Sequence, residues 1–191
     1  MKKIIMNFYY FIEFSKIISF KKIFGLNYVL NSLRYCWKNN IDKLLKYYDA
    51  TIGENNHFKG SLTIDNPNLL NSSKAFINIK IGNNCYIGKN VFFDLANKII
   101  IKDEVVISAG VTIMTHADVG DRVLNQYYKR VCEPVHIGKG TWIGVNVTIL
   151  SGVIIGEYCV IAAGSVVREN VEDFSMVAGV PATFKKDIRC T

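Results

Sequence analysis

The sequence predicts an all-β solenoid, a parallel β-helix that follows a helical N-terminal segment and ends in a short C-terminal tail. Three observations support this prediction. An aliphatic residue recurs every six positions along much of the chain, one long interruption leaves the register intact, and the first quarter differs in composition from the rest. With 191 residues, the chain has room for one domain with a sizeable core and a small appendage.

The first segment, residues 1–48, is basic, aromatic and expected to be helical. It holds nine Lys and Arg residues against two acids, whereas residues 49–191 hold fourteen of each, and it contains twelve of the 23 aromatic residues. Such a segment can pack as helices on the main body, lie on an anionic membrane surface or bind nucleic acid. We expect packing or peripheral membrane contact, and no nucleic acid. Polar residues interrupt its apolar runs well short of the ~20 residues of a membrane span, and no cleavage site follows.

The five cysteines indicate the compartment. They stand at positions 36, 85, 132, 159 and 190, include no C-x-x-C pair and are odd in number. This pattern argues against a disulfide framework and against a zinc knuckle. The expected location is the reduced cytoplasm, either free in it or at the inner face of the membrane.

The six-residue period defines the β-helix, residues 49–171. Its aliphatic positions are Ile81, Ile87, Phe93 and Ile99, then after a two-residue shift Ile101, Ile107 and Ile113, and finally Ile137, Ile143, Ile149, Ile155, Ile161 and Val167. The fourth residue after most of these positions is small or β-branched. These features fit a triangular coil of three six-residue sides, with the aliphatic residue inside and eighteen residues per turn. Residues 50–80 carry weaker traces and predict irregular first coils, and residues 172–191 are expected to cap the last coil.

The interruption is the candidate functional region. Ile113 and Ile137 are 24 positions apart, so a loop of eighteen residues, 117–134, is predicted to leave the column without changing its register. Long loops in compact folds are usually functional. His116 stands at its start. Counting one turn back from Ile113, with the two-residue shift, leads to Phe93, so Asp94 is expected in the adjacent coil near the same corner. A carboxylate beside an imidazole suits the activation of a hydroxyl group.

Four motifs in order resemble the hexapeptide-repeat acyltransferases, and within them the branch of maltose, galactoside and polysaccharide O-acetyltransferases. The motifs are Ile113-Met114-Thr115-His116-Ala117-Asp118, Trp142-Ile143-Gly144, Ala162-Ala163-Gly164-Ser165-Val166-Val167 and Val177-Ala178-Gly179-Val180-Pro181-Ala182. The resemblance covers about residues 77–186. It implies a left-handed coil, acetyl-CoA as the acyl donor, no metal, and a homotrimer with sites between neighbouring subunits.

The resemblance also implies roles for individual residues. His116 corresponds to the general base that deprotonates a sugar or glycan hydroxyl, which then attacks the thioester directly. The Val145 N–H would face the developing oxyanion, and Asp94 stands where relatives place an acceptor contact. Further coenzyme contacts are expected at Trp142, Gly144, Ala162 and Ala163, with Arg168, Lys185 and Lys186 as candidates for its phosphates. The three basic residues can equally be solvated surface charges, and Arg168-Glu169 replaces the family's frequent Thr-Lys.

Other functions remain open at this stage. The acceptor can be an amino group on a sugar, or serine, instead of a sugar hydroxyl. A zinc β-helix enzyme needs three converging histidines, whereas His57, His116 and His136 lack the close spacing of that class. A non-enzymatic scaffold would leave the loop and His116 without a role. Cys85 and Cys159 fall on small-residue positions of the repeat and are interpreted as core residues.

Overall fold

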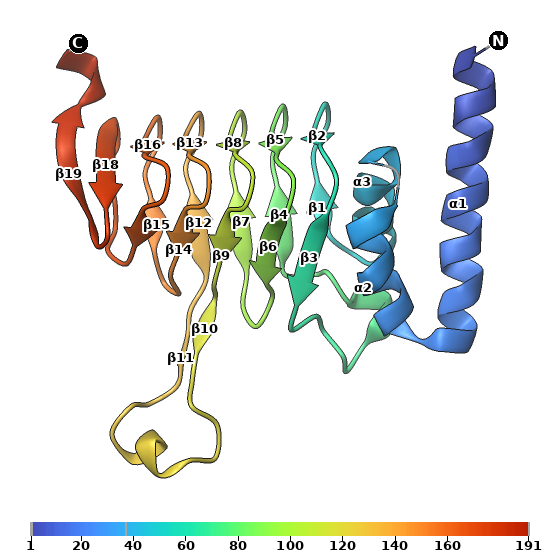
Figure 1. The fold of residues 1–191 in the computed structure, drawn as a ribbon, viewed down its shortest axis with the longest axis horizontal. Coiled ribbons are helices and arrows are strands. Elements are labelled where there is room, and N and C mark those ends of the chain that lie inside the picture. The colour runs from blue at the N-terminus through green and yellow to red at the C-terminus, as the bar shows by residue number, and fades with distance from the viewer. Residues whose placement is uncertain (1, 37, 191) are drawn as a thin grey trace.

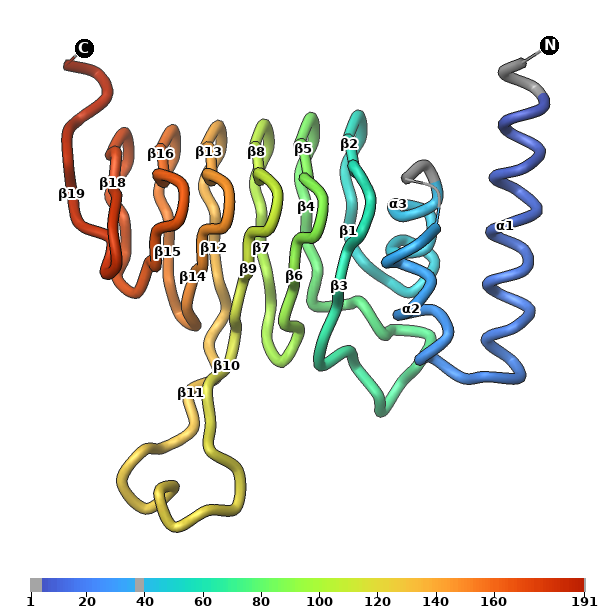
Figure 2. Tube along the Cα trace, in the orientation of Figure 1, coloured from blue at the N-terminus to red at the C-terminus, as the bar shows by residue number. Residues whose placement is uncertain are grey.

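Residues 2–36 and 38–190 are described by a computed structural model, in which a column of short stacked strands with three faces stands beside the N-terminal helices (Figure 1). The chain turns a corner after each short strand, and successive coils stack along the column (Figure 2). Met1, Trp37 and Thr191 lie outside the described residues.

Each face of the column is a sheet of stacked parallel strands, which we call faces A, B and C in chain order. Face A consists of β1 (Thr51–Ile52), β4 (Ile79–Ile81), β7 (Ile99–Ile101), β12 (Val135–Ile137) and β15 (Ile154–Ile155). Face B consists of β2 (His57–Phe58), β5 (Tyr86–Ile87), β8 (Val106–Ile107), β13 (Trp142–Ile143), β16 (Val160–Ile161), β18 (Ser175–Gly179) and the antiparallel β19 (Ala182–Asp187). Face C consists of β3 (Leu62–Asp65), β6 (Val91–Asp94), β9 (Thr112–Ile113), β14 (Thr148–Ile149) and β17 (Val166–Val167).

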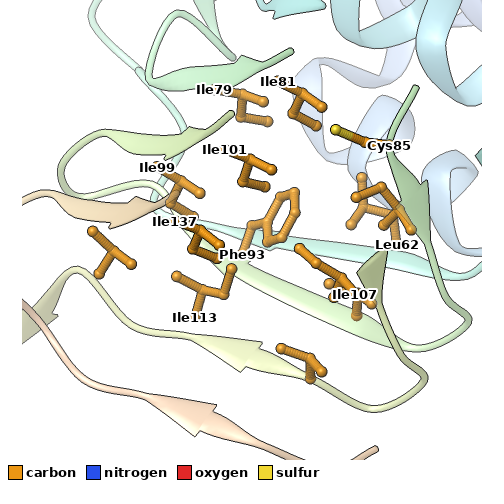
Figure 3. Packing of buried hydrophobic residues seen from close by; sticks show 14 of the residues in the cluster. Leu62, Ile79, Ile81, Cys85, Phe93, Ile99, Ile101, Ile107, Ile113 and Ile137 are labelled. Atoms are coloured by element: carbon orange, nitrogen blue, oxygen red, sulfur yellow. The ribbon is translucent and has the colours of Figure 1, made fainter. Parts of the chain in front are cut away.

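The predicted aliphatic positions fill the interior of the column (Figure 3). Phe93, Ile107 and Ile137 illustrate the three faces, and none of them has exposed surface. Burying one such side chain contributes roughly 1.5–3 kcal/mol, so the stacked interior is the main source of stability. Cys85 and Cys159 are buried among them, and burial raises the pKa of both thiols. The six-residue period and the core interpretation of these cysteines are therefore confirmed.

The register between stacked strands explains both the period and its irregularities. Ile137 pairs with Ile155, eighteen positions later, which is one turn. Ile101 pairs with Ile137, 36 positions later, which is one turn plus an eighteen-residue loop. Ile81 pairs with Ile101 at an offset of 20, the two-residue shift, and Ile52 with Ile81 at an offset of 29.

The first coil is more regular than the sequence predicted. Its strands β1, β2 and β3 pair in register with β4, β5 and β6 on all three faces. An insertion between β3 and β4 causes the larger offset, and this segment contains a 3-10 turn at Ser72–Lys74. The prediction of irregular coils was thus wrong for residues 51–65 and holds only for the segment that follows.

Three helices precede the column: α1 (Lys2–Phe24), α2 (Leu26–Tyr35) and α3 (Lys38–Tyr47). Leu33 of α2 and Leu44 of α3 are fully buried and belong to the same core cluster as the first coil. The helix α1 packs on α2 and α3 with one face and stands at the end of the molecule (Figure 1). Within the described residues, no helix is long and apolar enough to cross a membrane.

The C-terminal residues continue face B before they close it. Strand β18 lies parallel to β16, with Met176 opposite Val160 and Val177 opposite Ile161. Ser175 and Val177 are buried, so the expectation that the chain leaves the column at residue 172 needs correction: residues 175–177 add one more rung. Strand β19 then returns antiparallel to β18.

The long loop projects from the column as a hairpin (Figure 1). Its base is the antiparallel pair β10 (His116–Ala117) and β11 (Val131–Cys132), and a 3-10 turn at Val123–Gln126 lies in its outer part. Arg130 and Asp118 approach each other across the hairpin at 3.6 Å. The hairpin leaves from the corner between faces C and A, hereafter the C–A corner.

Candidate active site

His116 lies at the C–A corner with its backbone fixed by the hairpin. It pairs with Cys132 at the first rung of the β10–β11 ladder. Below this rung, the Glu133 N–H and the Ser151 hydroxyl both donate to the carbonyl of Thr115, at 3.0 and 2.8 Å. The His116 side chain remains 23% exposed, so its ring is both held in place and open to a substrate.

A buried carboxylate orients the imidazole ring. Asp94 ends β6, has no exposed surface, and its Oδ2 lies 2.6 Å from His116 Nδ1. The same oxygen accepts the backbone N–H groups of Thr115 (2.8 Å) and His116 (2.9 Å), while Oδ1 accepts from Asn66 Nδ2 (2.8 Å) and the Ala96 N–H (3.2 Å). Two oxygens thus meet five nitrogen donors.

These hydrogen bonds determine the charge of Asp94. Burial raises the pKa of the Asp94 carboxyl, but the hydrogen bonds from Asn66, His116, Thr115 and Ala96 together outweigh burial and hold the pKa below its usual value. The carboxylate is therefore ionised at neutral pH and can only accept hydrogen bonds. In the neutral imidazole, Nδ1 must then carry the proton, which leaves the lone pair on Nε2.

The predicted contact between Asp94 and His116 is confirmed, but the geometry gives Asp94 a different task from the one implied by resemblance. A carboxylate without exposed surface cannot touch an acceptor in this arrangement. Its position supports orientation of the ring instead of contact with the acceptor.

Sequence reasoning missed Asn66, which supports Asp94 from the coil below. Asp65 pairs with Asp94 across β3 and β6, so Asn66 follows directly at the same corner. Asn66 has a φ of +49°, a left-handed conformation that asparagine tolerates better than most residues. Two adjacent polar residues, Asp65 and Asn66, could have indicated this contact. The offset of 29 residues between the first and second coils hid the register that places them beside Asp94.

The expected coenzyme contacts gather at a different corner, between faces B and C, hereafter the B–C corner. Trp142 in β13 is 52% exposed, and its Nε1 donates to Ser108 Oγ at 3.1 Å. Gly144 follows, and a Cβ there would lie 2.6 Å from the Ala163 nitrogen, so the stacking of the coils requires glycine. Val145 is exposed, and its N–H meets no acceptor in the described part of the chain. Ala162 and Ala163 form the next rung of this corner.

The three basic candidates lie elsewhere. Lys185 and Lys186 are on β19 at the C-terminal end of face B, and Lys185 Nζ donates to Thr183 Oγ1 at 2.9 Å. Arg168 follows β17 at the C–A corner, where its guanidinium lies 3.1 Å from Glu169. The structure therefore separates Arg168 from the other coenzyme candidates within one chain.

His116 and Val145 also lie at different corners of the same chain. The width of face C separates them. Gly110 stacks below Asn146 at the B–C corner, and the chain then crosses face C through β9 to reach His116 at the C–A corner. Six extended residues span about 20 Å. A single chain therefore carries the two halves of the predicted site but does not join them.

The other histidines lie on other faces of the column. His57 lies on face B in β2, and His136 lies on face A in β12. Among the described residues, no three His, Cys, Asp or Glu side chains come together as metal ligands.

Family models match two parts of the column. Residues 78–114 match the hexapeptide repeat of succinyl-transferase, and residues 134–169 match the bacterial transferase hexapeptide (six repeats). The two segments flank the hairpin, and His116 lies between them, two residues after the end of the first.

Curated relatives extend the match beyond the repeats. The galactoside O-acetyltransferase of Escherichia coli is 31% identical over 147 residues, which are 77% of this chain and 68% of that protein. A probable acetyltransferase of Mycobacterium tuberculosis is 30% identical over 141 residues, 62% of this chain and 47% of that protein. A putative acetyltransferase of Staphylococcus aureus is 37% identical over 117 residues, 58% of this chain and 56% of that protein. The chain thus spans about half the length of the last two relatives.

Solved structures share the column. A hexapeptide-repeat-containing acetyltransferase from Vibrio cholerae superposes with a TM-score of 0.70 at 26% identity, covering 83% of this chain and 85% of its own. A galactoside acetyltransferase in complex with coenzyme A gives a TM-score of 0.71 at 27% identity, covering 83% and 76%. The chain therefore belongs to the hexapeptide-repeat acetyltransferases, and the predicted left-handed parallel β-helix is confirmed.

Proposed function

We propose that this protein transfers the acetyl group of acetyl-CoA to a hydroxyl of a sugar or polysaccharide precursor, with His116 as the general base. The observation that carries the proposal is the short contact of 2.6 Å between His116 Nδ1 and the buried, ionised Asp94. It leaves Nε2 unprotonated on a ring that is partly exposed beside a long hairpin. The galactoside O-acetyltransferase relative supports a sugar acceptor.

The proposed reaction is a direct transfer. His116 Nε2 takes the proton of the acceptor hydroxyl as its oxygen attacks the thioester carbonyl carbon. The Val145 N–H stabilises the negative charge that develops on the carbonyl oxygen. The C–S bond then breaks, and the imidazolium returns its proton to the departing thiolate, so the products are the acetyl ester and the free thiol of CoA. Asp94 stabilises the positive ring between the two proton transfers.

We propose a homotrimer as the active form. His116 at the C–A corner and Val145 at the B–C corner are about 20 Å apart along one chain, too far to act on the same acetyl group. In a cyclic trimer, the C–A corner of one column can meet the B–C corner of the next, and three equal sites result. The coenzyme would then lie along Trp142, Gly144 and the Ala162-Ala163 rung, with Lys185 and Lys186 beside its phosphates.

We place the protein in the reduced cytoplasm, with contact to the membrane surface through α1. All five cysteines are free thiols, which supports a reducing compartment. The outer face of α1 leaves Phe8, Phe11 and Ile23 each more than 60% exposed, and Lys16 and Lys22 lie exposed on the same helix. Aromatic residues with flanking lysines suit the interface of an anionic bilayer. Flotation with vesicles of anionic and of neutral lipid tests this, and an absence of binding to both would contradict it.

The central test compares two histidines. His116→Ala should lower the rate of CoA release with methyl galactoside or maltose by roughly 10²-fold or more, whereas His136→Ala on face A should leave the rate unchanged. Both variants should keep the wild-type circular dichroism spectrum. The product should be labile to mild base, as an ester is and an amide is not. Undiminished turnover in His116→Ala would refute the role of the ring.

A further inference from the structure

The B–C corner carries a basic groove whose cationic residues have no role in the proposed reaction. Two adjoining hollows lie along it towards the N-terminal end, each about 380 Å³ in volume. Lys59, Lys89 and Val145 line one of them, and Arg34, Lys59 and Lys89 line the other. The two hollows share both lysines and therefore form one groove, which begins at the proposed oxyanion donor.

The stacking of the coils fixes the direction of this groove. The rungs of the B–C corner follow the strand pairs β2–β5–β8–β13–β16, so Lys89, Ala109, Val145 and Ala163 succeed one another. Two strand spacings, about 10 Å, separate Lys89 from Val145. The rungs beyond Val145 carry only small residues, whereas the rungs before it carry Lys89 and Lys59.

The charges of the groove are unbalanced. None of the described residues that line either hollow is acidic. Arg34, Lys59 and Lys89 take part in none of the ion pairs found in the described part of the chain. Lys59 Nζ lies 5.3 Å from the centre of the Tyr86 ring, an arrangement that holds the ammonium group over the hollow's wall without neutralising it. Three cations that no described acidic residue neutralises, at the end of a concave surface, favour a doubly or triply charged anion.

We infer that this groove binds the diphosphate group of the acceptor, so that the acceptor is a sugar carried on a diphosphate. The inference rests on the proposed function, because the coenzyme candidates occupy the C-terminal side of Val145 and leave the N-terminal side to the acceptor. The sugar would lie next to Val145 and the partner subunit's catalytic ring, and its anomeric diphosphate would reach Lys89, Lys59 and Arg34. Arg34 belongs to α2, so the helical segment would form part of the acceptor site.

Binding of inorganic pyrophosphate tests the groove independently of catalysis. The full-length protein is first saturated with CoA, which fills the coenzyme phosphate sites, and is then titrated by calorimetry. The double variant Lys59→Ala/Lys89→Ala should weaken pyrophosphate binding by about 100-fold, since each lost charge-assisted contact is worth roughly tenfold. The matched variant Lys80→Ala/Lys102→Ala removes the same charge from two exposed lysines, one in β4 and one directly after β7, and should change binding less than threefold.

Three results would overturn the inference: equal weakening in both double variants, unchanged binding in the groove variant, or no pyrophosphate binding by the wild type. Titration with UDP-galactose and with vesicles that contain farnesyl diphosphate then separates a soluble nucleotide carrier from a lipid carrier. Acetyl transfer to the uncharged methyl galactoside is measured in parallel. Absence of acetyl transfer by the wild type to methyl galactoside and to UDP-galactose alike would contradict the proposed function and leave the pyrophosphate result standing.

Discussion

Replacing Asp94 by asparagine tests whether its charge, and not only its shape, supports His116. Asparagine keeps the size of the side chain but has one acceptor oxygen and one NH₂ group. At Oδ2, an NH₂ group would face the Thr115 and His116 N–H groups, so the amide oxygen must take that place. The NH₂ group then replaces Oδ1 and faces the Ala96 N–H, while the Asn66 amide can turn to accept from it.

The expected effect follows from this geometry. The ring keeps a hydrogen bond from Nδ1 but loses the negative charge that stabilises the imidazolium form during the transfer. A hydrogen bond to a charged group contributes about 1.5–3 kcal/mol, against about 1 kcal/mol for a neutral one. The difference predicts a fall in kcat of roughly 3- to 30-fold at 1.4 kcal/mol per factor of ten, with the KM for acetyl-CoA unchanged. Unfolding should also become easier by about 1–3 kcal/mol, because the Ala96 N–H loses its acceptor.

Two measurements separate these effects. CoA release with methyl galactoside gives kcat, and ¹⁵N spectra of labelled histidine report which ring nitrogen of His116 carries the proton, whatever the acceptor is. Asp103→Asn is the matched control, because Asp103 Oδ1 likewise accepts the Asn83 backbone N–H and side-chain amide, but away from both corners of the site. A kcat for Asp94→Asn equal to that of Asp103→Asn would refute the assigned role of the charge.

Three further outcomes are expected. Asn66→Gly, which keeps the left-handed backbone but removes the amide, should lower kcat several-fold without a change in the KM for acetyl-CoA, as steady-state kinetics will reveal; an unaltered kcat would exclude a positioning role. The Asp94 contribution to stability should be complete above the ordinary pKa of a carboxyl group and lost as the pH falls through the lower pKa of the folded state; urea titrations of the wild type and Asp94→Asn should therefore converge in acid. Gly144→Val should lower the melting temperature more than Gly164→Ala, since a Cβ at Gly144 meets the next coil at 2.6 Å, whereas Gly164 has nothing within 4 Å and only its φ of +70° opposes a side chain at a cost of about 1–2 kcal/mol; similar melting temperatures would contradict the stacking argument.

The sequence predicted the column because its period is a direct consequence of packing. Every sixth side chain must enter the same narrow interior, so Ile107, Ile143 and Ile161 reveal both the strands and their stacking without knowledge of any long-range contact. The contact of Asp94 with His116 followed from the same arithmetic. Only local register was needed for these inferences.

Features that depend on irregular segments could not be predicted in this way. The insertion before β4 shifted the first coil, and Asn66 was therefore invisible as a neighbour of Asp94. Arg168 lies at another corner than Trp142 because β17 belongs to face C and β13 to face B, which the spacing of the motifs alone does not reveal. The buried Asp94 carboxylate accepts hydrogen bonds from three successive coils. No single repeat contains all of these donors, so the repeat pattern alone could not predict the burial.

The reversal of β19 has a consequence for the length of the column. Each rung of parallel strands offers free backbone groups to the next, so an uncovered end would accept a strand from another molecule and grow into a fibre. At one end, α2 and α3 cover the first coil; at the other, β19 runs against the direction of every rung and points Lys185 and Lys186 outward. A strand added there would meet the positive charge of the two lysines and would lie beside a strand that runs opposite to all the rungs. Lys185 and Lys186 would thus oppose polymerisation of the column, whether or not they also bind the coenzyme.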